Sequence, residues 1–384
     1  MHRERVAAAL NHLAPDRCPW QSTFTPEFAE RLRADLRFDV SAGAHNPHGG
    51  GNPYDLEIAL DQDLLITSVG WANSYYGEGR EYVDEWGVGW VSVPYATPYG
   101  VGHYTEPCGH PLADADAEAV ARYRSPDPSR PELYADAERL IAEHGSEYWI
   151  VGSAVTTIFE TAWALRGLER LLTDFIEDPD LADAILEIPY RYHLTAAETL
   201  VRMGVDMIWL GDDVGQQQGM FISPRHWRRF LKPRMAFIVE RVKAINPGVK
   251  VAYHTDGCVY AVIPELIEIG IDVLNPIQPA AMDPVRVKRE YGKDLCFWGS
   301  IDEQHTLPFA GPQEVSKEVA DRIATLGAGG GLILAPTHHV QLDTPLENFW
   351  AMVKAVKGGS ARLEPREKAL DSNQLPHRDD ERNN

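Results

Sequence analysis

The sequence has few cysteines and no long apolar run. Four cysteines occur in 384 residues, at Cys18, Cys108, Cys258 and Cys296, and no two of them form a CxxC pair. This spacing argues against a disulfide framework and favours reduced thiols in a cytoplasmic protein. No stretch approaches the roughly 18 apolar residues of a membrane span, and the first residues lack the apolar core of a secretory signal. We therefore expect neither a membrane span nor export.

Positive charge is also scarce. Lys and Arg together number 36 against 57 Asp and Glu, which gives a formal net charge of -21. A surface of this sign repels phosphate backbones and anionic lipid, so nucleic acid and membranes are not expected as partners. A small-molecule substrate remains compatible with the charge. The sequence also lacks a GxSxG elbow, a Walker loop and a dinucleotide-binding glycine fingerprint, which argues against those nucleophile and nucleotide chemistries.

Strand-like and helix-like segments alternate from about residue 130 onward. Helix 312–326 is the clearest helix, with Pro312 at its start, one apolar face and Gly327 after it. Regular alternation predicts parallel strands joined by helical crossovers. Expected strands lie at 17–24, 63–67, 148–155, 207–210, 249–253, 273–275, 295–298 and 332–335. Eight strands predict a (β/α)8 TIM barrel, with a doubly wound open sheet as the second interpretation.

Residues 63–107 have a different pattern, rich in glycine and aromatics and roughly alternating. Antiparallel hairpins fit this pattern, so we predict an aromatic-rich cap inserted at about 63–110. The cap either packs on its own aromatic side chains, Trp86 among them, or forms a lid over a planar ligand. The whole of 1–363 is expected to form one domain, and the charged segment 364–384 a disordered tail.

Chemistry-bearing side chains follow two of the expected strands. His254-Thr255-Asp256-Gly257-Cys258 comes directly after the apolar run 249–253, and His338-His339 follows the strand 332–335. His254 and Asp256 are two apart, so in an extended segment they share a face. Together with His338 they form a plausible set of ligands for zinc or another divalent metal. The alternative is that they only join loops by hydrogen bonds.

Other strand ends supply further candidates. Asp213 could act as a general base, bind a cation or cap a turn. Glu160 and Asp302 are weaker catalytic candidates, and each could instead cap a helix. Adjacent histidines on a strand face opposite ways, so only one of the pair 338–339 is expected to point into a site. The residues assigned to substrate binding are Asn275, Gln278, Trp86 and His339.

The order and spacing of these motifs resemble the uroporphyrinogen decarboxylase superfamily. The resemblance extends over nearly the whole chain, and it implies a (β/α)8 barrel with its site at the carboxyl ends of the strands. The segments that carry it are 3–12, 15–17, 84–87, 222–224, 254–257, 270–278, 298–302, 335–341 and 345–348.

Two branches of that superfamily imply different chemistry. True uroporphyrinogen decarboxylases have an arginine-rich segment near the N-terminus that binds substrate carboxylates, whereas residues 19–26 here contain no arginine. Zinc-dependent corrinoid methyltransferases resemble this chain more closely, with His-x-Cys at the fifth strand and Cys at the eighth. His254, Asp256 and His338 occupy those positions here. This replacement makes the ligand set harder than a thiolate set.

The resemblance therefore implies a metal-dependent methyltransferase. It would move a methyl group between a small methylated substrate or corrinoid and an acceptor, either a thiol or a corrinoid protein, and it could act as a homodimer. One alternative is a decarboxylase of a tetrapyrrole or small acid. The other is a protein without enzymatic activity that binds a corrinoid or tetrapyrrole.

Overall fold

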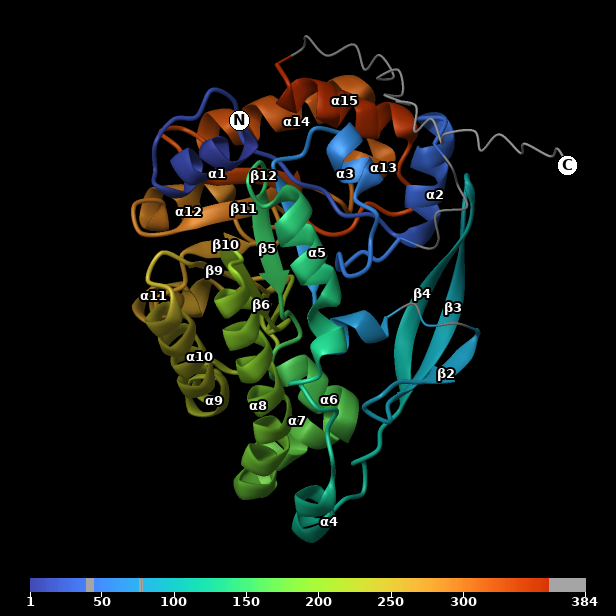
Figure 1. The fold of residues 1–384 in the computed structure, drawn as a ribbon, viewed down its shortest axis with the longest axis vertical. Coiled ribbons are helices and arrows are strands. Elements are labelled where there is room, and N and C mark those ends of the chain that lie inside the picture. The colour runs from blue at the N-terminus through green and yellow to red at the C-terminus, as the bar shows by residue number, and fades with distance from the viewer. Residues whose placement is uncertain (39–44, 76, 78, 359–384) are drawn as a thin grey trace, which may run out of the picture.

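The computed structural model describes residues 1–38, 45–75, 77 and 79–358. Its centre is a curled sheet of seven parallel strands in the order β1-β5-β6-β9-β10-β11-β12 (Figure 1). The predicted α/β fold with parallel strands is confirmed. The strands are β1 (Leu64–Ser68), β5 (Trp149–Ser153), β6 (Met207–Gly211), β9 (Lys250–His254), β10 (Val273–Asn275), β11 (Cys296–Ile301) and β12 (Leu332–Pro336).

An irregular segment closes the sheet where the sequence predicted a first strand. Trp20 and Phe24 form isolated parallel bridges with Leu334 and Val340 on the β12 side. On the other side, the backbone of Asp63 donates a hydrogen bond to the Trp20 carbonyl at 3.0 Å. The prediction of a strand over 17–24 is wrong because the segment forms only isolated bridges: it pairs with the β12 side through backbone, and largely through side chains on the β1 side. The Ser22 N–H, for example, donates to Oε1 of Gln62 at 2.9 Å.

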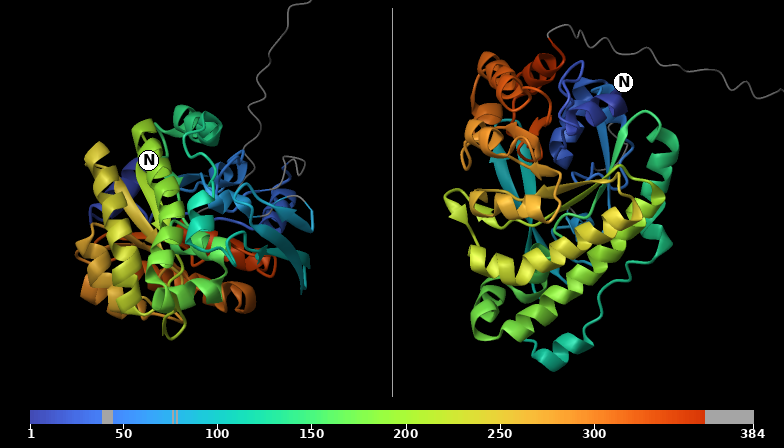
Figure 2. Two further views of the ribbon diagram at one scale, coloured as in Figure 1. Left: turned by 90° about the horizontal axis from the view of Figure 1, so that it is seen from below. Right: turned by 90° about the vertical axis from the view of Figure 1, so that its left-hand side faces the viewer.

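Helices cover the outside of the curled sheet, and Figure 2 shows them wrapped around it from two further directions. Proline at the first position begins several of them, including α2, α8, α12 and α14, because the first N–H of a helix needs no partner. The helices before β6 are α1 (His2–Leu10), α2 (Pro26–Asp35), α3 (Asp55–Ala59), α4 (Ala117–Arg122), α5 (Ala135–His144), α6 (Phe159–Arg166), α7 (Leu168–Glu177) and α8 (Pro179–Met203). Those after it are α9 (Pro224–His226), α10 (Lys232–Ile245), α11 (Ile263–Glu268), α12 (Pro284–Tyr291), α13 (Thr306–Phe309), α14 (Pro312–Thr325) and α15 (Leu346–Val356).

A three-stranded antiparallel sheet lies apart from the helices α8, α10 and α12, at the right in Figure 1. It consists of β2 (Glu81–Val83), β3 (Gly89–Thr97) and β4 (Gly100–Gly109). The sheet is fastened to α2, since the His103 N–H donates to Oε1 of Glu27 at 2.9 Å and the Arg31 guanidinium lies 3.8 Å from the ring centre of Tyr99. The first residues of the aromatic segment belong instead to β1.

Short elements complete the chain. The hairpin β7 (Gly215–Gln216) and β8 (Gly219–Met220) follows β6. Single turns of helix occur at Trp71–Ser74, Pro131–Tyr134, Trp227–Leu231 and Tyr260–Val262. The predicted tail 364–384 lies outside the described residues.

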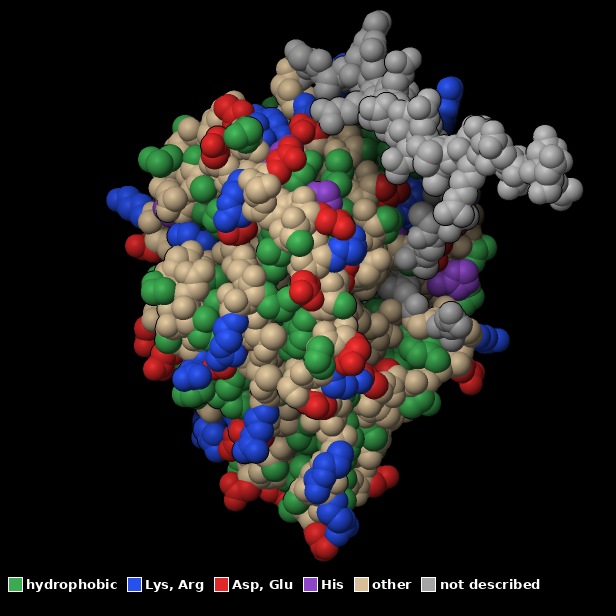
Figure 3. Space-filling view, in the orientation of Figure 1, with side chains coloured by type: hydrophobic (Ala, Val, Ile, Leu, Met, Phe, Trp, Pro, Cys, Tyr) green, Lys and Arg blue, Asp and Glu red, His purple; other side chains and the backbone are tan. Residues whose placement is uncertain are grey.

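Two surface features bear on the expected partners. In the described part of the chain, no helix has both the length and the apolar character needed to cross a membrane. On the face drawn in Figure 3, basic side chains are interspersed with acidic ones.

A buried carboxylate fastens the N-terminal segment to the start of β1. Asp63 is fully buried and accepts hydrogen bonds from Nη1 of Arg5 at 2.5 Å, Nη1 of Arg17 at 2.6 Å and the backbone of Trp20 at 3.0 Å. Burial alone would raise the pKa of Asp63. The hydrogen bond with His2 and the charges of Arg17 and Arg5 outweigh burial and hold that pKa below its usual value.

Replacing Asp63 should therefore destabilise the protein. We expect Asp63→Asn to lower the free energy of unfolding by about 3 kcal/mol, because it removes the buried carboxylate that the half-buried guanidinium groups of Arg5 and Arg17 share. Asp16→Asn is the control, since that carboxylate also pairs with Arg5 but is 65% exposed, and its loss should cost under about 1 kcal/mol. Denaturant titration measures both.

The effect of Asp63→Asn should depend on pH. A carboxylate with a lowered folded-state pKa stabilises the protein above its unfolded pKa of about 4, and this contribution is lost as the pH falls through the folded-state pKa. The difference between wild type and variant should therefore shrink in acid. Equal effects of the two substitutions at neutral pH would contradict this account of the N-terminal segment.

Candidate active site

The register of the parallel sheet brings three strand ends into one row. Gly211 of β6 pairs with His254 of β9, and His254 pairs with Asn275 of β10. Asp213 and Asp256 follow the first two of these strands by two residues. Parallel strands present their carboxyl ends at one edge, so the side chains that follow them meet there.

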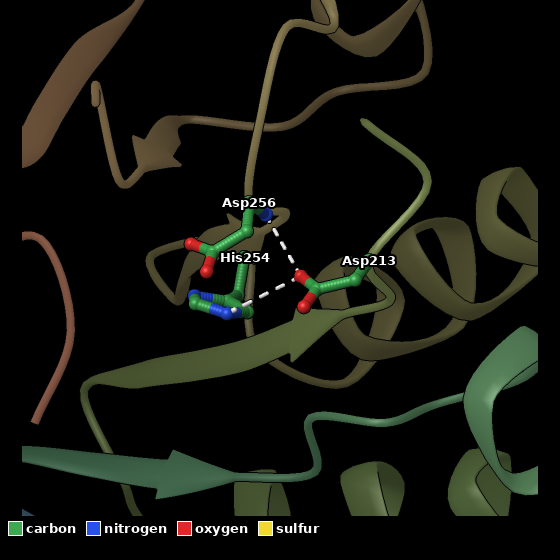
Figure 4. Close-up of side chains that lie close together, drawn as sticks. All are labelled: Asp213, His254 and Asp256. Carbon is green, nitrogen blue, oxygen red and sulfur yellow. Dashed lines mark hydrogen bonds and ion pairs between the residues drawn. The ribbon is translucent and has the colours of Figure 1, made fainter. Parts of the chain in front are cut away.

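Asp213, His254 and Asp256 converge at this edge (Figure 4), and one ligand atom from each lies within 4.8 Å of the others. The Asp256 N–H donates to Oδ1 of Asp213 at 2.7 Å, and Nε2 of His254 lies 3.5 Å from the same oxygen. Oδ1 of Asp256 is buried and has no hydrogen-bond partner among the described residues. A buried oxygen of this kind carries an unmet need for a proton donor or a cation.

A glycine makes the close approach of the two loops feasible. Gly257 has a φ of +81°, and a Cβ there would lie 2.4 Å from the backbone nitrogen of Gln216. Any other residue would clash with the loop that follows Asp213. The Gly257 N–H in turn donates to Oε1 of Gln278 at 2.6 Å, so Gln278 acts on the loop that carries Asp256.

Asn275 orients the imidazole of His254. The Asn275 amide nitrogen donates to the carbonyl of Trp298 at 2.8 Å, which turns its Oδ1 toward Nδ1 of His254 at 2.6 Å. An acceptor at this position favours the tautomer with the proton on Nδ1. Nε2, on the Asp213 side, then has its lone pair free to accept a proton or bind a metal.

The cluster borders a cavity with an empty volume of about 850 Å³, part of which is open to solvent. No Lys or Arg occurs among the described residues that line it. The lining residues are Gln21, Ser22, Thr23, His48, Tyr75, Tyr104, Val155, Thr156, Glu160, Trp209, Asp213, His254, Asn275, Ala335, Pro336, Thr337, His338 and His339. The described lining therefore combines carboxyl groups, imidazoles and aromatic rings and includes no permanently charged cation.

Burial shifts the titration of these groups toward their neutral forms. Desolvation, followed by the charges of Asp213 and Asp212, raises the pKa of Glu160 well above its usual value. Desolvation and the neighbouring Asp256 raise the pKa of Asp213, and desolvation also raises that of Asp256. Burial, and then the repulsion that a protonated His254 would exert, lower the pKa of His338 to about 4. The His338 ring is therefore neutral at pH 7.

The structure separates His338 from the close cluster. Its ring centre lies 6.5 Å from that of His254, and Asp213, predicted as a base, is the third member of the cluster instead. Both histidines of the pair line the cavity, whereas one was expected to do so. Nδ1 of His339 lies 2.6 Å from the hydroxyl of Thr23, which fixes that ring.

Four predicted residues are absent from the cavity lining: Asp256, which belongs to the close cluster beside it, and Asp302, Trp86 and Gln278. Asp302 accepts hydrogen bonds from the backbone of Gln304 and His305, so it caps the turn before α13, whereas its alternative interpretation was a helix cap. Trp86 is buried and packs on Tyr192, with ring centres 4.7 Å apart. Gln278 supports the loop after β9.

Trp209 and His48 are among the lining residues that sequence reasoning missed. Trp209 lies within β6, where an aromatic residue in an apolar strand looks like ordinary core. His48 lies in a segment rich in glycine and proline whose path the sequence does not predict. The aromatic alternation of the predicted cap did signal Tyr75 and Tyr104.

The role of Asn275 can be tested on the His254 ring itself. We expect Asn275→Leu, which is similar in size, to remove the preference for a proton on Nδ1, and ¹⁵N NMR of labelled histidines reports the tautomer directly. Thr23→Val is the control, because it removes the partner of His339 and leaves that of His254. An unchanged His254 spectrum in Asn275→Leu would refute the orienting role.

Comparisons with known proteins agree with this architecture. Residues 101–359 match the family model described as uroporphyrinogen decarboxylase. The uroporphyrinogen decarboxylase of Coxiella burnetii is 22% identical over 191 residues, 49% of this chain and 50% of that protein, and that of Psychromonas ingrahamii is 26% identical over 141 residues, 36% and 38% respectively. These alignments span about half, or less, of the curated relatives' length.

A solved structure extends the likeness in fold to almost the whole chain. A methyltransferase from Methanosarcina mazei superposes with a TM-score of 0.65 and 19% identity, covering 93% of this chain and 98% of its own. An identity this low establishes a shared fold and leaves the reaction open. The matched family model covers more than half of the sequence, and the chain therefore belongs to the uroporphyrinogen decarboxylase family.

Proposed function

We propose that this protein is a metal-dependent methyltransferase that takes a methyl group from a small substrate without net negative charge. The observation that carries the proposal is the Asp213–His254–Asp256 cluster, bordering a cavity whose described lining has no Lys or Arg. Substrates with several carboxylates need arginine or lysine partners once they leave water. Zinc is the first candidate for the metal, and a thiol or a corrinoid protein for the methyl acceptor.

The donor set suits a divalent ion. Two carboxylates and one imidazole are ligands that zinc and related metals accept, and they are harder than a thiolate set. The unpartnered Oδ1 of Asp256 would gain a partner by binding the ion, and His338 would provide a fourth donor if its ring moved toward His254. A metal held there supplies Lewis acidity that lowers the pKa of a bound thiol or polarises a methylated heteroatom.

The chain's own residues have separate tasks in this proposal. Asn275 holds His254 with Nε2 free, and Gln278 holds the loop of Asp256. Glu160 lines the cavity, and desolvation followed by the charge of Asp213 raises its pKa, which favours its protonated form. It would donate that proton to the oxygen of a methoxy substrate when the methyl group departs.

Decarboxylation remains the second candidate because the family model and the curated relatives carry that name. In that reaction Asp213 or Asp256 would stabilise a protonated intermediate. Two features weigh against a tetrapyrrole substrate with many carboxylates. Residues 19–26 contain no arginine, and His338 and His339 are neutral at pH 7 and offer no charge to a carboxylate.

Metal binding by the cluster is the first test. After equilibration with zinc and removal of free ions, elemental analysis should find about one ion per chain. His254→Ala and Asp256→Asn should weaken zinc affinity more than tenfold in competition with a chelator, because each removes a ligand. The control is His305→Ala, whose side chain is 70% exposed.

His338→Ala distinguishes two forms of the site. A loss of affinity comparable to that of His254→Ala indicates a fourth ligand, and unchanged affinity indicates three protein ligands. Wild-type zinc affinity in both His254→Ala and Asp256→Asn would contradict the assignment of the metal to this cluster.

The reaction itself separates the candidates. The probes are methylcobalamin as methyl donor and 2-mercaptoethanol as acceptor. We expect the zinc-loaded protein to form the methyl thioether, and the change in cobalamin absorbance reports the reaction. Asp213→Asn should slow this methyl transfer at least tenfold. Release of CO₂ from uroporphyrinogen is measured in parallel. Steady CO₂ release that persists after chelation, without methyl transfer, would replace the proposal with the decarboxylase. Tight cobalamin binding without either reaction would favour a carrier.

A further inference from the structure

The cavity offers aromatic faces and acidic side chains from different elements. Trp209 comes from β6, Tyr104 from β4 of the antiparallel sheet, and Tyr75 from the segment before β2. Glu160 and Asp213 provide the carboxyl groups of the lining. Aromatic rings and acidic side chains, with no Lys or Arg among the described lining residues, form an environment that recognises an organic cation.

Resting on the proposed methyl-transfer function, we propose that the substrate of this site carries a quaternary ammonium group, with one N-methyl group as the group transferred. Such a cation has no N–H to donate, so it is recognised by aromatic faces and nearby negative charge rather than by hydrogen bonds. This choice narrows the proposed substrate from any uncharged or positively charged methyl compound to a single chemical class.

Trp209 links cation recognition to the acidic cluster. Its ring is packed edge to face against His254, with centres 5.7 Å apart. A cation lies within about 6 Å of the aromatic ring that binds it. A methylammonium group on the cavity side of Trp209 would therefore lie beside His254 and Asp213, where the acceptor is to be activated.

Tyr104 brings the second ring toward the same charges. Burial, and then the negative charges of Glu160, Asp213 and Asp256, raise the pKa of its phenol to about 12. Those charges act on Tyr104 because β4 carries it to the cavity. If a divalent ion neutralises Asp213 and Asp256, the rings still favour a cation, and the described lining still offers an anion no Lys or Arg.

The transfer balances without a further reactant. A thiolate attacks the N-methyl carbon, the C–S bond forms, and the C–N bond breaks with its electron pair left on nitrogen. The products are a thioether and a neutral tertiary amine. Because the amine is uncharged when it forms, it loses its attraction to the rings, which favours its release.

A matched pair of ligands tests the proposal by binding alone. Choline and 3,3-dimethyl-1-butanol have the same shape, and only choline is charged. Calorimetry on the metal-free and zinc-loaded protein should show choline binding at least about tenfold tighter. Equal affinities would overturn the inference, and so would tighter binding of the neutral alcohol.

Two substitutions at one position provide the internal control. Tyr104→Phe keeps the ring and should retain choline binding, whereas Tyr104→Leu should weaken it about three- to tenfold and leave binding of the neutral alcohol unchanged. The side chain is partly exposed, so both variants are expected to fold. Equal choline affinity in the two variants would show that the Tyr104 ring does not bind the cation, and it would contradict the proposal.

The outcomes also separate this inference from the proposed function. If the protein transfers methyl from methylcobalamin to the thiol but does not prefer choline, only the proposal of a quaternary ammonium substrate is overturned. If the protein binds choline selectively but transfers no methyl group in any assay, the proposed cation-binding site stands and the proposed methyltransferase activity is overturned.

Discussion

The parallel register of β6, β9 and β10 is the constraint on which the site depends. It aligns Gly211, His254 and Asn275 in one row, so the loops that follow β6 and β9 start side by side. Gly257 then lets those loops approach to a distance that a side chain would forbid. A slip of one residue in β9 would turn His254 to the other face of the sheet and break the cluster.

Desolvation of acidic and imidazole side chains, with no Lys or Arg in the described part of the lining, determines how the groups of the cavity titrate. Carboxyl groups and imidazoles are gathered in one partly enclosed space, and each type shifts toward its uncharged form. Elsewhere the chain does pair its buried charge, as it does for Asp63 with Arg5 and Arg17. Burying Asp213 and Asp256 without arginine partners costs stability. Binding of a cation at this site would offset that cost.

The sequence predicts the architecture well because the βα alternation is strong and local. It predicts that His254, Asp256 and Asp213 lie at strand ends, and the structure brings these three together. It does not predict which of Asp213 and His338 lies closer to His254, since that depends on the curvature of the sheet and on loop paths. For the same reason Asp302 and Trp86 looked functional, although one caps a turn and the other packs in the core.

Hydrogen bonds between side chains and backbone also cannot be predicted from periodic patterns in the sequence. The segment around Trp20 occupies a strand's place in the sheet, yet it is held in part by Gln62 and Asp63 rather than by a regular ladder. Likewise, the orientation of His254 depends on Asn275, which in turn depends on a carbonyl of the next strand. Such chains of contacts become visible only in three dimensions.

The central claim is that Asp213, His254 and Asp256 together hold a divalent metal. Anomalous diffraction from a crystal of the zinc-loaded protein, recorded on both sides of the zinc absorption edge, tests it most directly. The account predicts one strong anomalous peak within bonding distance of all three side chains. A peak bound by other residues, or no peak at this cluster at full zinc loading, would contradict it.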